Sequence, residues 1–427
     1  MQTSGNETVA EGAAGAGGVE REVHRFTEVA CIVDAGGYGA GISLFSMGTI
    51  LPLFVRQLTE SPFLIGLIPA VYWAGLFLPQ LVVARAIAHL PRLRRYVMII
   101  AVLERVFLAL LVPLTLWLWR NPEALLVAFF LAWAGHALST GLNWVSYFGM
   151  VAKIVPATRR GRLFGVAGAL GGAFAVAGAR LAEHLLKDGG MPYGFVWCFA
   201  VGSVVLVATV VPLGFVREPD GEPLAEPPHA GPRQITILLR ADPAFGRFVA
   251  SHICYALAGA APAFYTVYAL EHLGATPTDV ARFTAVLTGV TVLAYPLWGM
   301  LGDSGGNRRV VTAAAALASA GALLALLAPT LGLFYGVFAF QAAAACGIGL
   351  ASGNMVLEFG PPARAPTYLA VHSSCTMPAM ALAPVVAGAI AGALGYRGIF
   401  AAAAALALAA SLGWARTAEP RKRQAPP

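Results

Sequence analysis

Long apolar runs separated by short polar breaks extend along almost the whole chain. A helix that crosses a bilayer needs about 20 predominantly apolar residues. Twelve runs of this kind are present, at residues 29–55, 63–84, 96–118, 124–150, 163–185, 194–216, 247–270, 280–301, 310–328, 331–357, 367–394 and 398–415. The pattern predicts an all-α polytopic membrane protein with twelve transmembrane helices.

The segment at residues 217–246 is the one long polar interruption, and it is rich in proline and charge. It separates two sets of six runs, and a weak repeat relates the sets: Arg94-Arg95 follows the second run and Arg308-Arg309 follows the eighth. We therefore predict two pseudo-symmetric six-helix bundles, a design typical of secondary transporters. The predicted boundaries are a disordered cytoplasmic tail at 1–27, an N-terminal bundle at 28–216, a cytoplasmic connector at 217–246, a C-terminal bundle at 247–415 and a cytoplasmic tail at 416–427.

The composition agrees with a membrane protein, since 58% of the 427 residues are hydrophobic and 11% are charged, against about 25% charged in soluble domains. The net charge of +7 is explained by topology. With both termini in the cytoplasm, 21 of the 28 Lys and Arg residues fall in cytoplasmic segments, as the positive-inside rule requires. We therefore expect an integral protein of the cell (plasma or inner) membrane, surrounded by the lipid bilayer, with no nucleic-acid partner.

Sequence signatures of several enzyme classes are missing. None of the three lysines follows a glycine, so the chain has no Gly-Lys phosphate-binding motif. It also has no H-E-x-x-H, no G-x-S-x-G and no clustered Cys/His set. The five cysteines lie in apolar runs without C-x-x-C spacing and are predicted to be small buried residues. We expect no enzymatic activity, no catalytic residue, no cofactor and no metal site.

The most specific local pattern follows the eighth run and reads GMLGDSGGNRR. It resembles the loop signature G-x-L-a-D-r-x-G-r-k of the major facilitator superfamily, with Ser304 and Asn307 standing where the signature has basic residues. The resemblance implies two six-helix bundles that rock about a central cavity. It also implies an inner gate in which the Asp pairs with a basic residue or a helix N-terminus, formed by Gly299, Gly302, Asp303, Gly306, Arg308 and Arg309.

Four charged residues lie well inside the predicted spans, more than three residues from either end, and form the predicted intramembrane charge network: Asp34, Glu104, Arg105 and Arg180. A charge in hydrocarbon is costly, and it is a functional hypothesis by default. Adjacent residues point about 100° apart on a helix, so Glu104 and Arg105 each need a partner elsewhere. Asp34 is the candidate partner of Arg105. The network is either a structural ion pair inside the N-terminal bundle or a proton relay.

Further polar residues fall on helices that line the cavity if the resemblance holds. The candidates for the substrate cavity are His136, Asn143, His252, Tyr265, Tyr268, Gln341, Asn354 and His372. Hydrogen-bonding groups with aromatic neighbours suit an uncharged or weakly charged organic solute. Hydrogen bonds between helices are the alternative role for each of them. Five glycines between Gly165 and Gly178 predict close helix packing in the fifth run.

These features together predict secondary active or facilitative transport of a small organic solute by alternating access. The expected partner is that solute, either alone or together with a proton. The chain is expected to be a monomer. Two alternatives stay open. One is multidrug or metabolite efflux, and the other is a non-transporting membrane receptor or scaffold on the same fold.

Overall fold

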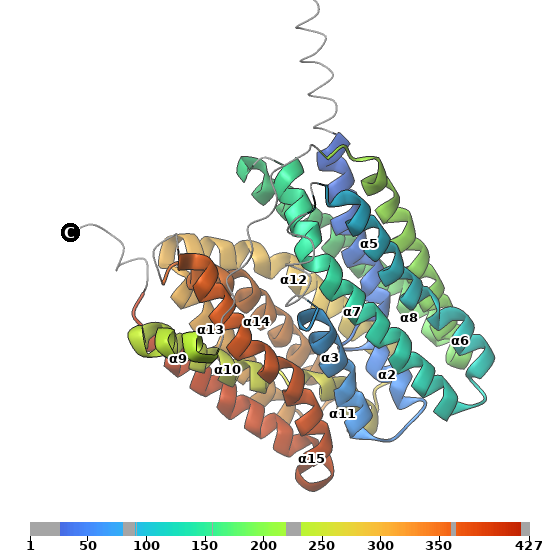
Figure 1. The fold of residues 1–427 in the computed structure, drawn as a ribbon. Helices are drawn as coiled ribbons and strands as arrows, with labels where there is room; N and C mark the ends of the chain where they lie inside the picture. The colour runs from blue at the N-terminus through green and yellow to red at the C-terminus, as the bar shows by residue number, and fades with distance from the viewer. Residues whose placement is uncertain are drawn as a thin grey trace, which may run out of the picture.

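The computed structural model describes residues 26–79, 90, 92–155, 157–218, 232–359 and 364–419. Helices and their connecting turns make up these residues, and they contain no strand (Figure 1). Residues 26–42 form the first helix. The N-terminal half continues with η1 (Ser43–Phe45), α2 (Ile50–Arg56), α3 (Pro62–Phe77), α5 (Arg94–Ala109), α6 (Leu111–Leu118), α7 (Pro122–Ile154), α8 (Ala157–Val210) and η2 (Val211–Phe215).

The C-terminal half contains α9 (Pro232–Ala241), α10 (Pro243–Ala258), α11 (Pro262–His272), α12 (Pro277–Gly305), α13 (Asn307–Leu327), α14 (Leu331–Leu357) and α15 (Ala365–Ala415). Helix α9 and the start of α10 fall inside the predicted connector. The rest of that connector at 219–231, the N-terminal tail up to residue 25 and the last residues, 420–427, lie outside the described residues. The bundle boundaries therefore stay predictions.

The described residues include nine helical spans long and apolar enough to cross a membrane. Two of them, Gly165–Phe215 and Thr367–Ala415, are twice the usual length. Each is interrupted by a glycine with non-helical geometry, Gly190 in α8 and Gly395 in α15. Dividing both spans there and adding the shorter apolar helix Pro62–Phe77 accounts for the twelve predicted crossings.

Several helices begin where the sequence supplies a capping residue followed by proline. Asn121 accepts a hydrogen bond from the backbone of Ala124 at the start of α7. Thr276 and Asp279 form a reciprocal capping box at the start of α12. Such caps satisfy backbone N–H groups that have no partner inside the helix, and proline at the first position is preorganised for helix geometry. The starts of α7 and α12 were therefore readable from the sequence.

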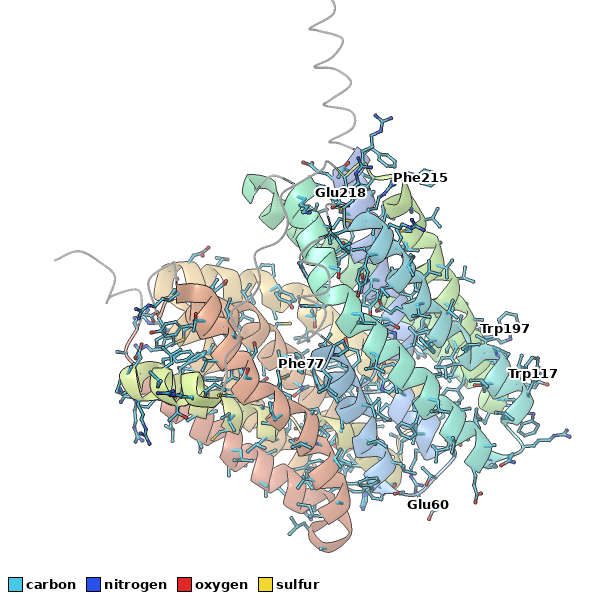
Figure 2. The ribbon with its side chains drawn as sticks, viewed as in Figure 1. Glu60, Phe77, Trp117, Trp197, Phe215 and Glu218 are labelled. Carbon is cyan, nitrogen blue, oxygen red and sulfur yellow. The ribbon has the colours of Figure 1, made fainter. Side chains whose placement is uncertain are left out.

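The exterior of the helices is apolar, as a bilayer requires. Trp117, Trp197 and Phe215 point away from the N-terminal half (Figure 2), with relative exposures of 79%, 58% and 70%. Large exposed hydrophobic side chains are unusual on a soluble protein when they cover the whole surface. Here they form the surface that faces lipid.

Two ends of the molecule can be distinguished. Glu60, in the loop between α2 and α3, marks one end, and Glu218 marks the opposite end (Figure 2); after the predicted topology they are called the outer and the inner end. Arg56 of α2 lies 2.7 Å from Glu271 of α11, and Arg282 of α12 lies 2.7 Å from Glu183 of α8. Both ion pairs join the two halves of the chain toward the outer end.

The first and seventh crossings are both interrupted, at corresponding positions of the two halves. A turn at Ser46–Thr49 separates η1 from α2, and residues 259–261 separate α10 from α11. The first break contacts the helix that follows the second, because Thr266 of α11 donates a hydrogen bond to the Gly48 carbonyl at 2.7 Å. Paired helix breaks near the midplane are the usual location of binding sites in transporters.

Candidate functional site

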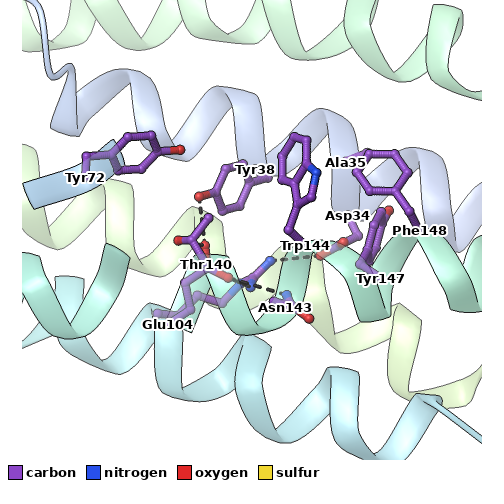
Figure 3. A pocket seen from close by; sticks show the side chains of 11 residues that line it. Asp34, Ala35, Tyr38, Tyr72, Glu104, Thr140, Asn143, Trp144, Tyr147 and Phe148 are labelled. Atoms are coloured by element: carbon purple, nitrogen blue, oxygen red, sulfur yellow. Dashed lines mark hydrogen bonds and ion pairs between the residues drawn. The ribbon is translucent and has the colours of Figure 1, made fainter. Parts of the chain in front are cut away.

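A cavity of about 220 Å³ lies within the N-terminal half. Its walls come from the first helix, α3, α5 and α7 (Figure 3). The lining residues are Asp34, Ala35, Tyr38, Tyr72, Glu104, Arg105, Thr140, Asn143, Trp144, Tyr147 and Phe148. Three of the four charges predicted inside the membrane therefore line one cavity.

The ion pair expected between Asp34 and Arg105 is present, with 2.9 Å between Oδ1 and Nη2. Both residues are buried, at 6% and 3% exposure. Arg105 also donates from Nε to the Leu206 carbonyl at 2.7 Å and from Nη1 to the Ala101 carbonyl at 3.0 Å. These bonds hold the guanidinium between the first helix and α8, which offsets part of the cost of burying it.

Glu104 is held by a different set of partners. Its Oε1 accepts hydrogen bonds from the hydroxyls of Tyr38 and Thr140, each at 2.8 Å. Its Oε2 has only distant contacts, with Asn143 Nδ2 at 3.5 Å and Arg105 Nη1 at 3.9 Å. The two adjacent charged residues thus have separate principal partners, as their angular separation on α5 predicts.

Three further polar atoms of α7 are buried without a hydrogen-bond partner among the described residues: His136 Nε2, Asn143 Oδ1 and the Tyr147 hydroxyl. His136 Nδ1 lies 3.4 Å from the Glu104 carbonyl oxygen. A carbonyl only accepts, so Nδ1 carries the proton and Nε2 is left as an acceptor. Asn143 lines the cavity and His136 lies behind the lining.

Aromatic side chains form most of the remaining wall: Tyr38, Tyr72, Trp144, Tyr147 and Phe148. Figure 3 shows these rings around the ends of the charged side chains. The sequence reasoning missed all five, together with Thr140. The sequence could have indicated two of them. Tyr38 lies four residues after Asp34, and Tyr147 lies four residues after Asn143, so each shares a helix face with a predicted site residue.

The remaining cavity candidates lie in the C-terminal half and do not line this cavity. His252 and His372 form a hydrogen bond with each other, with 2.9 Å between Nδ1 of His252 and Nε2 of His372. Tyr265 and Tyr268 are at most 7% exposed and pack in an aromatic cluster with Phe400. These two residues are core residues, because α11 turns them toward α14 and α15.

Gln341 and Asn354 also differ from the expectation of one shared site. Gln341 lines a separate cavity of about 30 Å³, together with Tyr255 and Tyr265. Asn354 is exposed and donates to the Leu350 carbonyl of its own helix at 3.0 Å. The structure therefore divides the predicted cavity set between the two halves.

Arg180 does not belong to the charge network, which corrects the sequence prediction. Its side chain is 67% exposed and pairs with Glu183 at 3.0 Å. Glu183 in turn pairs with Arg282 of α12. Helix α8 carries Arg180 toward the outer end and away from Asp34, so its charge reaches the membrane surface instead of the cavity.

The predicted gate motif forms the inner end of α12 and the start of α13. Gly306 is the single residue between these helices and has a φ of 83°. Asp303 is exposed, and within the described residues it has no hydrogen bond or ion pair. Gly299 and Gly302 lie on α12, and Arg309 is exposed on α13. The expected pairing of Asp303 is absent from this conformation.

Arg308 has a counterpart in the first half that the sequence repeat indicated. Arg94 donates from Nη1 to two backbone carbonyls at the end of η2, at 3.0 and 2.9 Å, and Glu218 accepts from the Arg94 backbone N–H at 2.6 Å. Arg308 donates from Nη1 to the Ala415 carbonyl at 2.9 Å, and its Nε lies 3.7 Å from Glu419. In each half, an arginine and a glutamate at the inner end thus connect the third membrane crossing to the sixth: α5 to η2 in the first half, and α13 to the end of α15 in the second.

Comparisons with known proteins agree with this architecture. The sequence profile of the Major Facilitator Superfamily matches residues 36–269 and 248–427. Curated proteins show no match to the chain. A D-xylose–proton symporter superposes with a TM-score of 0.71 at 16% identity, covering 92% of this chain and 98% of that one.

Two other solved structures are similar over the same extent. A POT family transporter in complex with a thioalcohol-conjugated peptide has a TM-score of 0.69 at 14% identity, covering 92% of this chain and 95% of its own. The nucleoside transporter NupG has a TM-score of 0.68 at 11% identity, covering 92% and 99%. At these identities the three structures establish the fold alone.

Proposed function

The chain belongs to the major facilitator superfamily, and from that premise we propose that it carries a small organic solute across the cell membrane by alternating access. The single observation behind this proposal is the buried network of Asp34, Glu104 and Arg105 on the wall of a cavity. Buried charges in a membrane protein mark pathways for substrates or ions. The cavity is accordingly the proposed solute site.

The conformation described is proposed to be open toward the inner end. Helices α8 and α12 touch at mid-depth, where a Cβ added to Gly172 would collide with Val292. Toward the inner end, a Cβ added to Gly165, Gly168 or Gly299 would meet no atom within 4 Å. Gly165 and Gly168 lie seven and four residues before Gly172, on the same helix face.

The orientation and assembly follow from the charge distribution and the fold. We propose that both termini lie in the cytoplasm of the cell, so that the inner end faces the cytoplasm, as the positive-inside bias requires. The proposed unit is a monomer, because the cavity is formed within one chain. Efflux of drugs or metabolites is the second candidate function, because it uses the same architecture.

Spin-label distances and solute exchange test the proposal together. One label pair, at Glu60 and Pro277, spans the two halves at the outer end, and another, at Arg95 and Arg309, spans them at the inner end. We expect each pair to show two distance populations that change in opposite directions. A pair within one half, Glu60 with Glu123, is the control and should show one population.

The same purified protein in liposomes should exchange at least one member of a panel of radiolabelled sugars, amino acids, nucleosides and amines. A single unchanging distance for both pairs, with no exchange of any solute, would contradict alternating access. It would favour the receptor or scaffold alternative.

A further inference from the structure

We propose that the cavity in the N-terminal half takes a small organic cation, an ammonium with N–H donors and an apolar or aromatic body, bound through Glu104. This inference concerns the cargo of the transport site and therefore rests on the proposed function. It replaces the expectation, drawn from polar residue types alone, of an uncharged or weakly charged solute.

The charge balance of the cavity is the first argument. Two carboxylates, Asp34 and Glu104, and one guanidinium, Arg105, line it. Asp34 and Arg105 neutralise each other at 2.9 Å, so the carboxylate of Glu104 remains. Because a buried charge is costly without a partner, an incoming positive charge is favoured.

Nearby titratable groups do not cancel this negative charge. His136 is fully buried, and a second proton on its Nε2 would create a buried donor without an acceptor. The other titratable side chains that line the cavity are tyrosines from the first helix, α3 and α7, which are neutral as phenols. The site therefore carries a formal charge of about −1, counted from reference protonation states.

Hydrogen-bonding capacity points the same way. Glu104 Oε2 has its nearest donor at 3.5 Å, which is beyond a good hydrogen bond. Asn143 Oδ1 has no partner among the described residues. These two atoms can only accept, so a ligand that satisfies them must bring donors, while the Tyr147 hydroxyl, which also has no partner among the described residues, can donate or accept.

The cavity has no uncompensated positive charge that would bind an anionic solute as Glu104 would bind a cation. The Nε and both Nη atoms of Arg105 already donate, to Leu206, Ala101 and Asp34. These bonds engage three of the five N–H groups of the guanidinium, but its charge is already balanced by Asp34 at 2.9 Å, so an anion would add a second uncompensated negative charge beside Glu104.

The walls of the cavity suit the body of such a cation. Five of the eleven lining residues are aromatic, including Trp144, and aromatic faces attract cations. The volume of about 220 Å³ is below the range of roughly 300–1,000 Å³ that is typical for drug-sized ligands. A single-ring amine is therefore a better match than a large drug.

A matched set of three probes tests the charge requirement. Phenethylammonium, 2-phenylethanol and 3-phenylpropanoate share a phenyl ring and a short chain, and they differ in charge. Titrations of the purified chain in nanodiscs, followed by calorimetry, should show binding of phenethylammonium at least about tenfold tighter than of the other two, which corresponds to about 1.4 kcal/mol. Equal binding of the alcohol and the ammonium would overturn the proposal, and so would preferential binding of the carboxylate.

Variants locate the site. Glu104→Gln should weaken phenethylammonium binding at least about tenfold, while Glu104→Asp should retain part of it. Glu60→Gln, at a side chain that is 93% exposed, is the matched control and should leave binding unchanged. If Glu104→Gln does not fold, Asn143→Leu removes an acceptor without changing the charge and should still weaken binding. Unchanged binding in every foldable cavity variant would place the site elsewhere and overturn the proposal.

The two proposals fail in distinguishable ways. If the label pairs exchange between two distances but the three probes bind alike, the cation inference is wrong and alternating access stands. If phenethylammonium binds selectively while the distances never change, the cation site stands and alternating access is wrong.

Discussion

Replacing Asp34 with Asn tests the buried ion pair, because Asn keeps the shape of the side chain and removes its charge. The change leaves Arg105, which is 3% exposed, without its principal partner. Breaking a buried pair by removing one member costs about 3–5 kcal/mol. Arg105 keeps its bonds to two backbone carbonyls and lies 3.9 Å from Glu104 Oε2. We therefore expect a loss at the lower end of the range, about 3 kcal/mol.

A double-mutant cycle separates the pair from the rest of the site. Arg105→Met alone leaves Asp34 buried and unpaired, whereas Asp34→Asn with Arg105→Met removes both charges. The loss in the double variant should be smaller than the sum of the single losses by about 2 kcal/mol, within the range of coupling energies between contacting residues. Exchanging the two residues should not restore stability, because a carboxylate at position 105 would face the carbonyls of Ala101 and Leu206.

The assay is unfolding by SDS titration in mixed micelles, followed by tryptophan fluorescence. Glu60→Gln provides the control, since an exposed charge of this kind contributes at most about 1 kcal/mol. The reasoning is refuted if Asp34→Asn unfolds within about 0.5 kcal/mol of the wild type. It is also refuted if the losses of the two single variants add in full.

Three further predictions concern the joints between helices. Gly168→Leu should fill the open space between α8 and α12 and hold the inner end open, so that the inner label pair keeps its long distance. Arg56→Gln should weaken the outer joint with Glu271 by about 1 kcal/mol, because both side chains are only partly buried, and it should increase the outward-open population of the outer label pair. Gly306→Ala should destabilise the chain by about 1–3 kcal/mol in the SDS titration, because φ is 83° and a Cβ would lie 2.7 Å from Glu419 Oε2.

The Gly168→Leu and Gly306→Ala predictions each have a control. Gly332→Leu adds the same bulk at a glycine at the start of α14 that also has open space around it, and it should leave the distances unchanged. If Gly168→Leu exchanges between states like the wild type, the inner closure does not use this face of α8. Arg309→Gln removes an exposed charge next to the turn and should be nearly neutral. Equal stability of Gly306→Ala and the wild type would contradict the strain expected at this position.

The candidate site was only partly predictable, and individual residues show why. Asp34 and Arg105 were identifiable because a buried charge needs a partner and few charges are available within the spans. Arg180 satisfied the same criterion, but α8 carries it to the outer end, where Glu183 pairs with it. Tyr265 fell on a predicted cavity-lining helix, yet it packs in the core. The sequence places a residue at a depth, and it does not show which way the helix face turns.

The gate motif shows that a sequence pattern locates residues but does not show which contacts they make in a given conformation. Its glycines, Asp303 and its arginines were found from a short pattern, and the structure places them at the junction of α12 and α13. Asp303 has no partner among the described residues, and a contact made in only one state of a transporter cannot be located from a single conformation. The role of this residue as a gate stays a prediction.

The sequence alone determined the membrane class, the approximate positions of the crossings and the two-half organisation, because a bilayer requires a continuous apolar helix for every crossing. It also indicated which charges must be buried. The tertiary structure decided which of those charges meet, that Glu104 keeps an oxygen without a close donor, and that aromatic rings surround it. The reason is physical: hydrophobicity sets the depth of a helix in the membrane, whereas its rotation and its neighbours depend on packing between segments far apart in the chain.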